Sequence, residues 1–349
     1  MHESKYKVSV IITTYNSESY IKKTFDLLIN QSFSDFEIIC VNDCSTDNTG
    51  LLLSCYDQMY DDVRVINNAE NRGAGYSRNV GMNAARGEYI IFLDDDDVYN
   101  PEMLEKAYNA ASQRQADILF FGSEEFDCVT QIQFKHSARI FTIFPDRLTF
   151  SAEDIDKDVL RVAQWRCWDR MFRRDYVIQT GITFQEMPST NDFYFSAGTF
   201  LKCKKISYIT DSLITYARNR SGSTTDSRNK TYVCSVLAVE KFKEFLYENN
   251  IYDKYRCDYI NFVLSFFLWY IESIRGDNFL KLYNLLKECL IRLSITQDDI
   301  YNDSEKKFFH EIISLDGVSY LRLLKENFYQ EKENLSKITS CLLAKLNIQ

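Results

Sequence analysis

The stretch GEYIIFLDDDDVYNPEML, residues 87–104, decides the fold. Tyr89 to Leu93 form a continuous apolar run, which is typical of a strand that is covered on both faces. Four aspartates, Asp94 to Asp97, follow at once. Asn100 and Pro101 then start a helix with proline at its first position. The stretch therefore predicts one strand–turn–helix step of an α/β fold.

Four other apolar runs surround this stretch. They are Val8 to Ile12, Phe36 to Val41, Val63 to Ile66 and Asp117 to Phe121. Amphipathic segments separate the runs, and single helices between strands indicate βαβ units and a mostly parallel sheet. The sequence therefore predicts an α/β domain of Rossmann-like type.

Polar residues follow the strands at the edge where ligands bind. In open parallel sheets, ligands lie beyond the carboxyl ends of the strands. Four polar clusters occupy that position: Thr14 to Asn16, Asn42-Asp43, Asn71 to Gly73 and Asp94 to Asp97. Their convergence predicts a single site that is assembled from distant segments.

The composition narrows the function. The net charge of −9 is unusual for a nucleic-acid binder. Ten scattered cysteines without a CxxC pair indicate reduced thiols in a cytosolic protein. Because the three histidines are far apart, a zinc site is not expected, and a bound metal would be Mg²⁺ or Mn²⁺ held by carboxylates.

The 349 residues suit two domains, or one domain with a long appendage. We expect a domain over residues 1–228, with a nucleotide-binding half at about 1–122 and an acceptor half at about 123–228. A helical region then covers residues 229–349. Within it, Phe262 to Ile271 is apolar but about half the length of a bilayer span. A buried helix is the preferred interpretation, and an interfacial helix is the alternative.

Individual carboxylates and arginines have a functional and a structural interpretation. In extended backbone, Asp94 and Asp96 would share one face and could bind one hard cation, whereas the alternative is a solvated, helix-capping turn. Asp43 could accept the imide N–H of uracil, or cap the next helix, or do both. Arg78 could pair with diphosphate or base oxygens, or form a surface salt bridge.

Two later segments complete the predicted site. In PSTNDFYF, capping by Thr190 or Asn191 would place Asp192 in the first helical turn, where the dipole favours an ionised general base. An ordinary helix start is the alternative. Further on, Arg218, Arg220 and Ser223 lie in one loop that could close over a phosphate or link two domains.

Together these segments resemble the family 2 inverting glycosyltransferases, which have the GT-A fold. The matching segments occur in order within residues 6–225: VSVIITTYN, QSFSDFEIICVNDCSTDNT, NRGAGYSRNVGMNAARGEYIIFLDDDDVYNPEML, WRCWDRMFRRDYVIQTGITF and TNDFYF. The chain departs from the usual pattern at Thr13, Cys44 and Asn191, where Pro, Gly and Glu are frequent.

The resemblance implies a role for each matching position. Those that would bind the nucleotide are Thr14, Tyr15, Asp43, Arg78, Asp94 and Asp95. Asp94 and Asp96 would be the outer acids of the D-x-D motif and would hold Mn²⁺ or Mg²⁺ on the diphosphate, with help from Asp97. Asp192 would be the base for the acceptor hydroxyl.

The implied reaction is transfer of a hexosyl or N-acetylhexosaminyl group, with inversion, from a nucleotide-sugar, for which UDP is expected. The implied acceptor is a hydroxyl of a saccharide or lipid-linked saccharide, in bacterial polysaccharide synthesis in the cytoplasm or at the inner face of the membrane. A catalytically inactive nucleotide-binding scaffold is the alternative. A nucleotidyltransferase would need a glycine-rich loop after the first strand, and TTYNSES offers none.

Overall fold

The structure is a computed structural model that describes residues 5–135, 141–162, 166–218, 228–327 and 329–330. The chain divides into two compact units, Met1–Tyr259 and Ile260–Gln349, and the division falls within helix α10 (Tyr252–Ser273). The predicted boundary at residue 228 stays a prediction. Each unit is described by itself.

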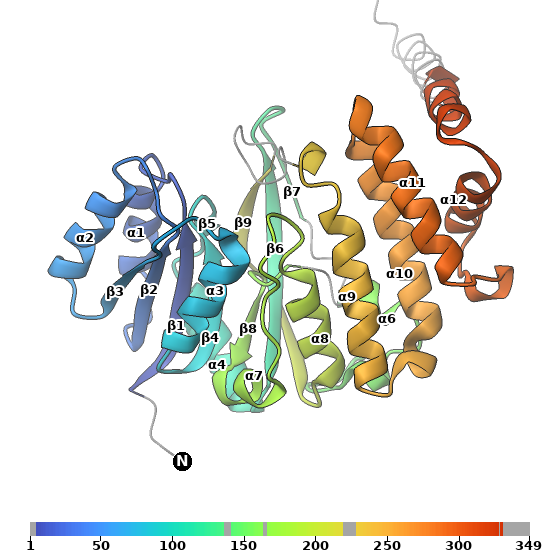
Figure 1. The fold of residues 1–349 in the computed structure, drawn as a ribbon. Coiled ribbons are helices and arrows are strands. Elements are labelled where there is room, and N and C mark those ends of the chain that lie inside the picture. Colours follow the sequence, from blue (N-terminus) through green and yellow to red (C-terminus); the bar gives the residue numbers. More distant parts are fainter. Residues whose placement is uncertain (1–4, 136–140, 163–165, 219–227, 328, 331–349) are drawn as a thin grey trace, which may run out of the picture. The chain divides into compact units, whose positions relative to one another are not determined.

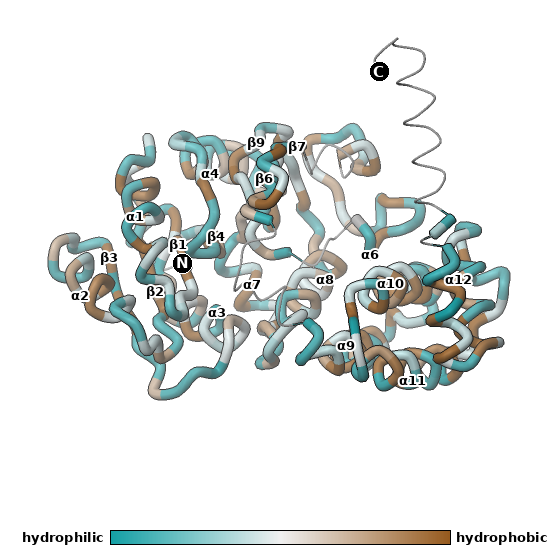
Figure 2. The backbone as a smooth tube through the Cα atoms, turned by 90° about the horizontal axis from the view of Figure 1, so that it is seen from above, coloured by the Kyte–Doolittle hydropathy of each residue, from teal (hydrophilic) through white to brown (hydrophobic). Residues whose placement is uncertain are grey.

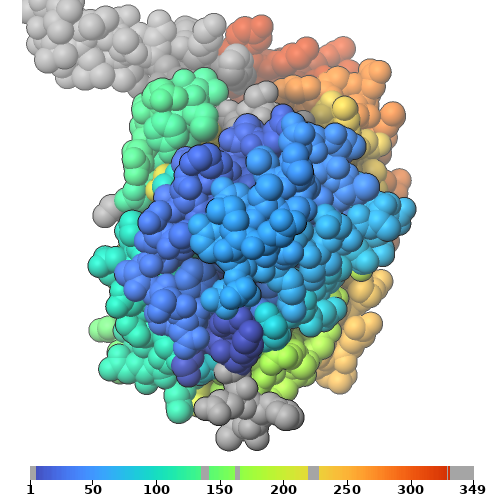
Figure 3. Space-filling model, turned by 90° about the vertical axis from the view of Figure 1, so that its left-hand side faces the viewer, coloured from blue at the N-terminus to red at the C-terminus, as the bar shows by residue number. Residues whose placement is uncertain are grey.

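The first unit begins with a parallel sheet. Strands β1 (Tyr6–Thr14), β2 (Phe36–Asn42), β3 (Val63–Asn67) and β4 (Gly87–Asp94) lie in the order β3-β2-β1-β4, and each neighbouring pair is parallel. Helices α1 (Ile21–Ile29), α2 (Thr49–Met59) and α3 (Gly73–Ala84) connect them (Figure 1). This half confirms the predicted βαβ pattern, and its N-terminal elements, drawn in blue, form most of the face in Figure 3.

Beyond β4 the sheet is mixed, which corrects the prediction of a mostly parallel sheet. The short strand β8 (Arg170–Arg173) lies between β4 and β6 (Ile118–Asp127), antiparallel to both. Strand β9 (Ile206–Arg218) runs parallel to β6. The short strand β5 (Val98–Tyr99) pairs antiparallel with β9, and β7 (Ile132–Lys135) pairs antiparallel with β6. The predicted fifth strand therefore exists, but β8 separates it from the fourth.

Helices cover both faces of the sheet. Figure 2 shows β1 and β4 between α1 and α4 (Met103–Arg114) on one side and α3 and α7 (Arg174–Thr180) on the other. The buried side chains alternate accordingly along β1: Val10 and Ile12 belong to the core under α1 and α4, whereas Ile11 faces α3. An added Cβ at Gly81 of α3 would collide with Ile11, so the absence of a side chain there permits close helix–sheet packing.

The second half of this unit adds helices. α8 (Phe193–Lys202) packs on α9 (Cys234–Glu248), through ring contacts of Phe193 and Tyr194 with Phe242. Two short helices, η1 (Ala152–Asp154) and α6 (Val159–Val162), precede β8. The unit thus carries a helical layer beyond the mixed half of its sheet.

The second unit is helical in its described part. It contains the end of α10, α11 (Asp277–Arg292), η3 (Gln297–Asp299) and α12 (Asp303–Ser314). The hydroxyl of Tyr283 donates to the carbonyls of Ile312 (2.8 Å) and Leu315 (2.7 Å), which joins α11 to the end of α12. Most of the apolar run at 262–271 is buried in α10, as predicted, although 43% of Trp269 is exposed. Among the described helices, none has the length and apolarity to cross a membrane.

Candidate active site

The predicted polar clusters meet at the carboxyl edge of the parallel strands. Thr14 at the end of β1 pairs in register with Asn42 of β2, and Thr13 pairs with Asp94 of β4. The backbone N–H of Asp43 donates to the carbonyl of Thr14 at 2.9 Å. Segments about 80 residues apart in sequence therefore form one continuous edge, because parallel strands end together.

Asp43 is almost fully buried and fixes the start of α3. Its Oδ1 accepts hydrogen bonds from the backbone N–H of Arg72 (3.0 Å) and from Nδ2 of Asn68 (2.8 Å), and its Oδ2 accepts one from the N–H of Gly73 (2.6 Å). The carboxylate thus satisfies free N–H groups at a helix N-terminus. The capping role predicted for Asp43 is real, but the helix is α3 and not the next one in sequence.

Arg78 of α3 connects the two sides of the site. Its Nη2 donates to Oδ1 of Asp94 at 2.8 Å, and its Nη1 donates to Oδ1 of Asn191 at 3.0 Å. The side chain is buried, so the surface-salt-bridge interpretation is wrong. One guanidinium therefore links the end of β4 to the segment before α8.

Asp192 immediately precedes α8, which begins at Phe193, so it occupies the N-cap position and not the first turn. Its side chain makes no capping hydrogen bond, and the expected caps Thr190 and Asn191 lie outside the helix. Burial raises the pKa of Asp192 to about 6, while the positive charge of Arg78 acts in the opposite direction. A carboxyl group with this pKa is ionised at neutral pH and can still take up a proton.

The acidic run is bent. β4 ends at Asp94, and Asp95 and Asp96 lie in a turn, so the alternation that predicted a shared face for Asp94 and Asp96 does not apply. The Asp95 carboxylate accepts a hydrogen bond from the Ser17 hydroxyl. Asp97 is buried, and its Oδ1 accepts from the N–H of Ala217 at 3.2 Å. Burial, followed by the nearby Asp94 and Asp96, raises the pKa of Asp97 well above its usual range.

The carboxylates of the acidic run are suitable ligands for a hard cation whose remaining ligands come from the substrate and water. Among the residues that the structure describes, no group of three His, Cys, Asp or Glu side chains could hold a metal ion alone. Mg²⁺ in nucleotide sites, however, typically takes one or two carboxylates together with substrate phosphates and water. Asp94 and Asp96 are both partly exposed and supply such oxygens.

The remaining predicted residues differ in their placement. Thr14 is buried, whereas 49% of Tyr15 is exposed just beyond β1, where its ring can meet a ligand. Arg218 ends β9 and lies 3.5 Å from the buried Glu125 in an ion pair. Arg220 and Ser223 lie outside the described residues.

Cys44, where glycine is frequent in the family pattern, has a left-handed backbone with φ of 59°.

The sequence did not identify the segment that holds Asn191 in place. The side chain of Asn79 makes two hydrogen bonds with the backbone of Phe184, donating at 2.9 Å and accepting at 2.8 Å. The N–H of Gln185 in turn donates to the carbonyl of Asn191 at 3.0 Å. The sequence feature that could have indicated this segment is Asn79, which follows Arg78 in a helix rich in small residues.

Comparison with known proteins shows which family the sequence matches. The model of the family "Glycosyl transferase family 2" matches residues 9–181, which begin within β1 and include β2, β3 and β4. The chain belongs to glycosyltransferase family 2. This result confirms the expected family and enzyme class.

Two curated relatives of this family 2 chain come from the bacteria Bacillus subtilis and Staphylococcus aureus. It is 27% identical over 260 residues to the putative glycosyltransferase EpsH of Bacillus subtilis strain 168, covering 74% of each chain. It is 30% identical over 222 residues to the poly(ribitol-phosphate) beta-N-acetylglucosaminyltransferase TarS of Staphylococcus aureus strain MW2, covering 62% of this chain. The match spans only 36% of that longer relative.

A solved structure shows the same fold. The crystal structure of S. aureus TarS 1-349 in complex with UDP-GlcNAc superposes with a TM-score of 0.58 at 20% identity, covering 88% of this chain and 90% of that one. The GT-A fold with a helical C-terminal region is thereby confirmed.

Proposed function

We propose that this family 2 chain is an inverting glycosyltransferase that moves a hexosyl or N-acetylhexosaminyl group from a UDP-sugar to a hydroxyl of a saccharide or lipid-linked acceptor. The observation that carries the proposal is the bridge made by Arg78. It joins Asp94, at the edge expected to bind the donor, to Asn191, next to the partly buried carboxyl of Asp192. One buried guanidinium thus contacts both the proposed donor-binding carboxylate and the residue next to the proposed proton acceptor.

The chemistry assigned to Asp192 is a single displacement. Its carboxylate takes the proton of the acceptor hydroxyl as the oxygen forms a bond to the anomeric carbon. The bond from that carbon to the diphosphate oxygen breaks on the opposite face, and UDP leaves with the electron pair. Attack from the opposite face inverts the configuration.

The donor side would be held by the carboxyl edge of the sheet. The exposed ring of Tyr15 and the edge formed by Thr14 and Asp43 would receive the base. Asp94 and Asp96 would hold Mn²⁺ or Mg²⁺, which when bound supplies positive charge to the leaving diphosphate. Arg78 keeps Asp94 oriented, and its charge favours the ionised form of Asp192.

The relatives support the choice of donor and stereochemistry. TarS was crystallised with UDP-GlcNAc, and its name states β-transfer. Because UDP-GlcNAc carries an α-linked sugar, β-transfer from it requires inversion. All nine cysteines in the described part of the chain are free thiols, which supports a reducing, cytoplasmic setting.

The test is calorimetric titration of UDP into the full chain, first with Mn²⁺ and then with excess EDTA, followed by a screen of UDP-sugars for turnover. We expect binding that EDTA abolishes, and release of UDP from one or more sugars with a saccharide acceptor. Failure of UDP to bind in both conditions would overturn the donor assignment. Binding without turnover of any UDP-sugar would favour the nucleotide-binding scaffold instead.

A further inference from the structure

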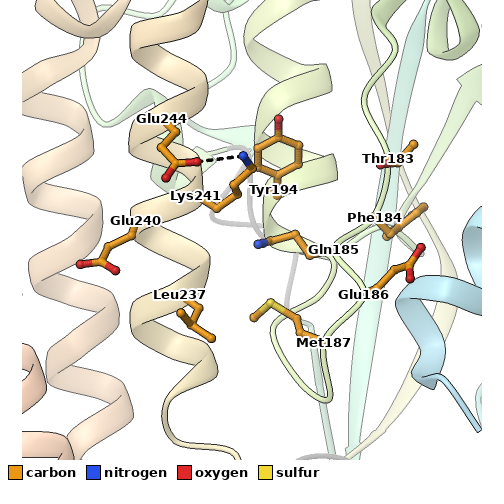
Figure 4. A pocket seen from close by; sticks show the side chains of 10 residues that line it. All are labelled: Thr183, Phe184, Gln185, Glu186, Met187, Tyr194, Leu237, Glu240, Lys241 and Glu244. Carbon is orange, nitrogen blue, oxygen red and sulfur yellow. Dashed lines mark hydrogen bonds and ion pairs between the residues drawn. The ribbon is translucent and has the colours of Figure 1, made fainter.

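A second concave site lies in the first unit, on the far side of the segment that holds Asn191. Residues 183–187, the start of α8 and one face of α9 enclose a groove of about 550 Å³ (Figure 4). That volume lies within the usual range for small-molecule sites, about 300–1,000 Å³. None of the nucleotide-binding or catalytic residues proposed above lines the groove.

The groove face of α9 is polar for a local reason. Leu237, Glu240, Lys241 and Glu244 are spaced at i, i+3, i+4 and i+7, so they form one stripe along the helix. The intervening residues Ala238, Val239, Phe242 and Phe245 are buried. The stripe is therefore the outward face of an amphipathic helix, and residues 183–187 face it across the groove (Figure 4).

The opposite wall offers a hydrogen-bond donor. The side chain of Gln185 points into the groove with its amide nitrogen (Figure 4), whereas its Oε1 is buried. The amide N–H groups can donate to the hydroxyl oxygens of a ligand. Tyr194 adds a phenol, whose hydroxyl group can donate or accept a hydrogen bond.

The charges of the groove select against phosphate. Glu186, Glu240 and Glu244 line it with one cation, Lys241, whose Nζ lies 2.8 Å from Glu244. Glu186 pairs with Arg72 on its other side. Carboxylates, an amide and a phenol can exchange hydrogen bonds with sugar hydroxyls, whereas a phosphodiester would meet like charge.

The groove and the proposed active site share one support. Gln185 donates its backbone N–H to Asn191, the residue that contacts Arg78, and Tyr194 lies two residues after Asp192. One wall of the groove is therefore joined directly to the segment that carries Asn191 and Asp192.

We propose that the groove between residues 183–187 and α9 is a second saccharide subsite, which binds an uncharged sugar unit next to the one that is glycosylated. The inference rests on the proposed function and deepens it: the acceptor is a neutral oligosaccharide and not a phosphate-linked polymer. Gln185, Tyr194 and Glu240 supply the hydrogen bonds, and Leu237 supplies an apolar contact for the ring.

Saturation-transfer NMR with the full chain tests the subsite without turnover. The probes are lactose and N,N′-diacetylchitobiose, which are neutral, and 6′-sialyllactose, which is anionic, each at up to about 10 mM, where weak sugar binding is detectable. Leu237→Trp fills the groove with a larger side chain at a half-exposed position. Leu51→Trp, on the exposed face of α2, is the matched control.

We expect at least one neutral disaccharide to bind, and Leu237→Trp to weaken that binding by about tenfold or more while Leu51→Trp leaves it unchanged. Absence of binding by both neutral probes, equal or stronger binding of 6′-sialyllactose, or unchanged affinity in Leu237→Trp would each overturn the subsite. UDP titration of the same samples separates the two proposals. If Leu237→Trp loses disaccharide binding but still binds UDP, the groove binds the disaccharide independently of the nucleotide site. If no sample binds UDP, the result counts against the proposed function.

Discussion

Buried charged side chains at the two ends of the parallel strands differ in their hydrogen bonding. At the amino end, Glu37 of β2 is fully buried and completely satisfied. Its Oε1 accepts from the Ser9 hydroxyl and the Arg86 N–H, both at 2.7 Å, and its Oε2 accepts from Nε (3.0 Å) and Nη2 (2.7 Å) of Arg86. The Ser9 oxygen in turn accepts from the N–H of Gly87 at 2.8 Å.

At the carboxyl end, two buried polar atoms of the described residues lack hydrogen-bond partners, although the buried Asp43 is satisfied. Oδ2 of Asp97 and Nε of Arg78 are buried and have no hydrogen-bond partner in the described part of the chain. Burial raises the pKa of both Asp97 and Asp192. Such unsatisfied groups cost stability and are retained where a ligand or a reaction uses them. Glu37 and Asp97 are both buried carboxyl groups of this unit, and they differ in how completely their hydrogen bonds are satisfied.

The largest expected effect is on sugar transfer, and it comes from a substitution at the carboxyl end of the strands. Asp192→Asn removes the proton acceptor but keeps the shape, so we expect sugar transfer to fall by about 10³-fold. UDP affinity, measured by calorimetry, should stay within about threefold because the donor contacts are elsewhere. Asp175→Asn, at an exposed position of α7, is the control and should keep full activity. Normal transfer by Asp192→Asn would contradict the base assignment.

At the amino end, the effect should be on stability alone. Glu37→Gln removes the charge that Arg86 pairs with, and because Arg86 is partly exposed, we expect a loss of about 2 kcal/mol in the free energy of unfolding in urea. Glu88→Gln, whose partner Lys7 lies 3.7 Å away at the surface, should cost less than about 0.5 kcal/mol. A changed UDP affinity in folded Glu37→Gln would break the division between the two ends.

The pH dependence of transfer should reveal Asp192. The base must be ionised to accept a proton, so with a pKa of about 6 the value of kcat/KM should rise with pH and level off above about pH 6. Below that value it should fall about tenfold for each pH unit. The measurement is kcat/KM between pH 4.5 and 8, with UDP binding followed at the same pH values. A profile without an acidic limb in this range would exclude the assignment.

The smallest effect is expected at Asp97. Burial, with the nearby Asp94 and Asp96, raises the pKa of Asp97 well above its usual range, so Asp97→Asn removes a charge that the folded protein disfavours and keeps the size of the side chain. UDP affinity with Mn²⁺ should change by less than about threefold. Asp94→Asn, which removes the charge that pairs with Arg78, should weaken it by about tenfold or more. Equal losses in both variants would show that Asp97 is ionised.

Much of the fold and part of the site could be predicted from local patterns. The runs at Val8 to Ile12 and Tyr89 to Leu93 are apolar throughout because their strands are covered on both faces. The polar ends of β1, β2 and β4 meet because parallel strands share an edge. The insertion of β8 between β4 and β6 had no such signal, because strand order depends on pairing between distant segments.

The sequence by itself determined the α/β class, the family and the edge where the site lies, because apolar runs and motif spacing can be read from local stretches of sequence. Only the tertiary structure decided how the charges are used. Arg78 reaches Asn191 across 113 positions, Asp43 caps α3 and not α2, and Asp192 lies before α8 and not within it. These outcomes depend on which side chains are desolvated together, and desolvation is a property of the packed chain that no local pattern contains.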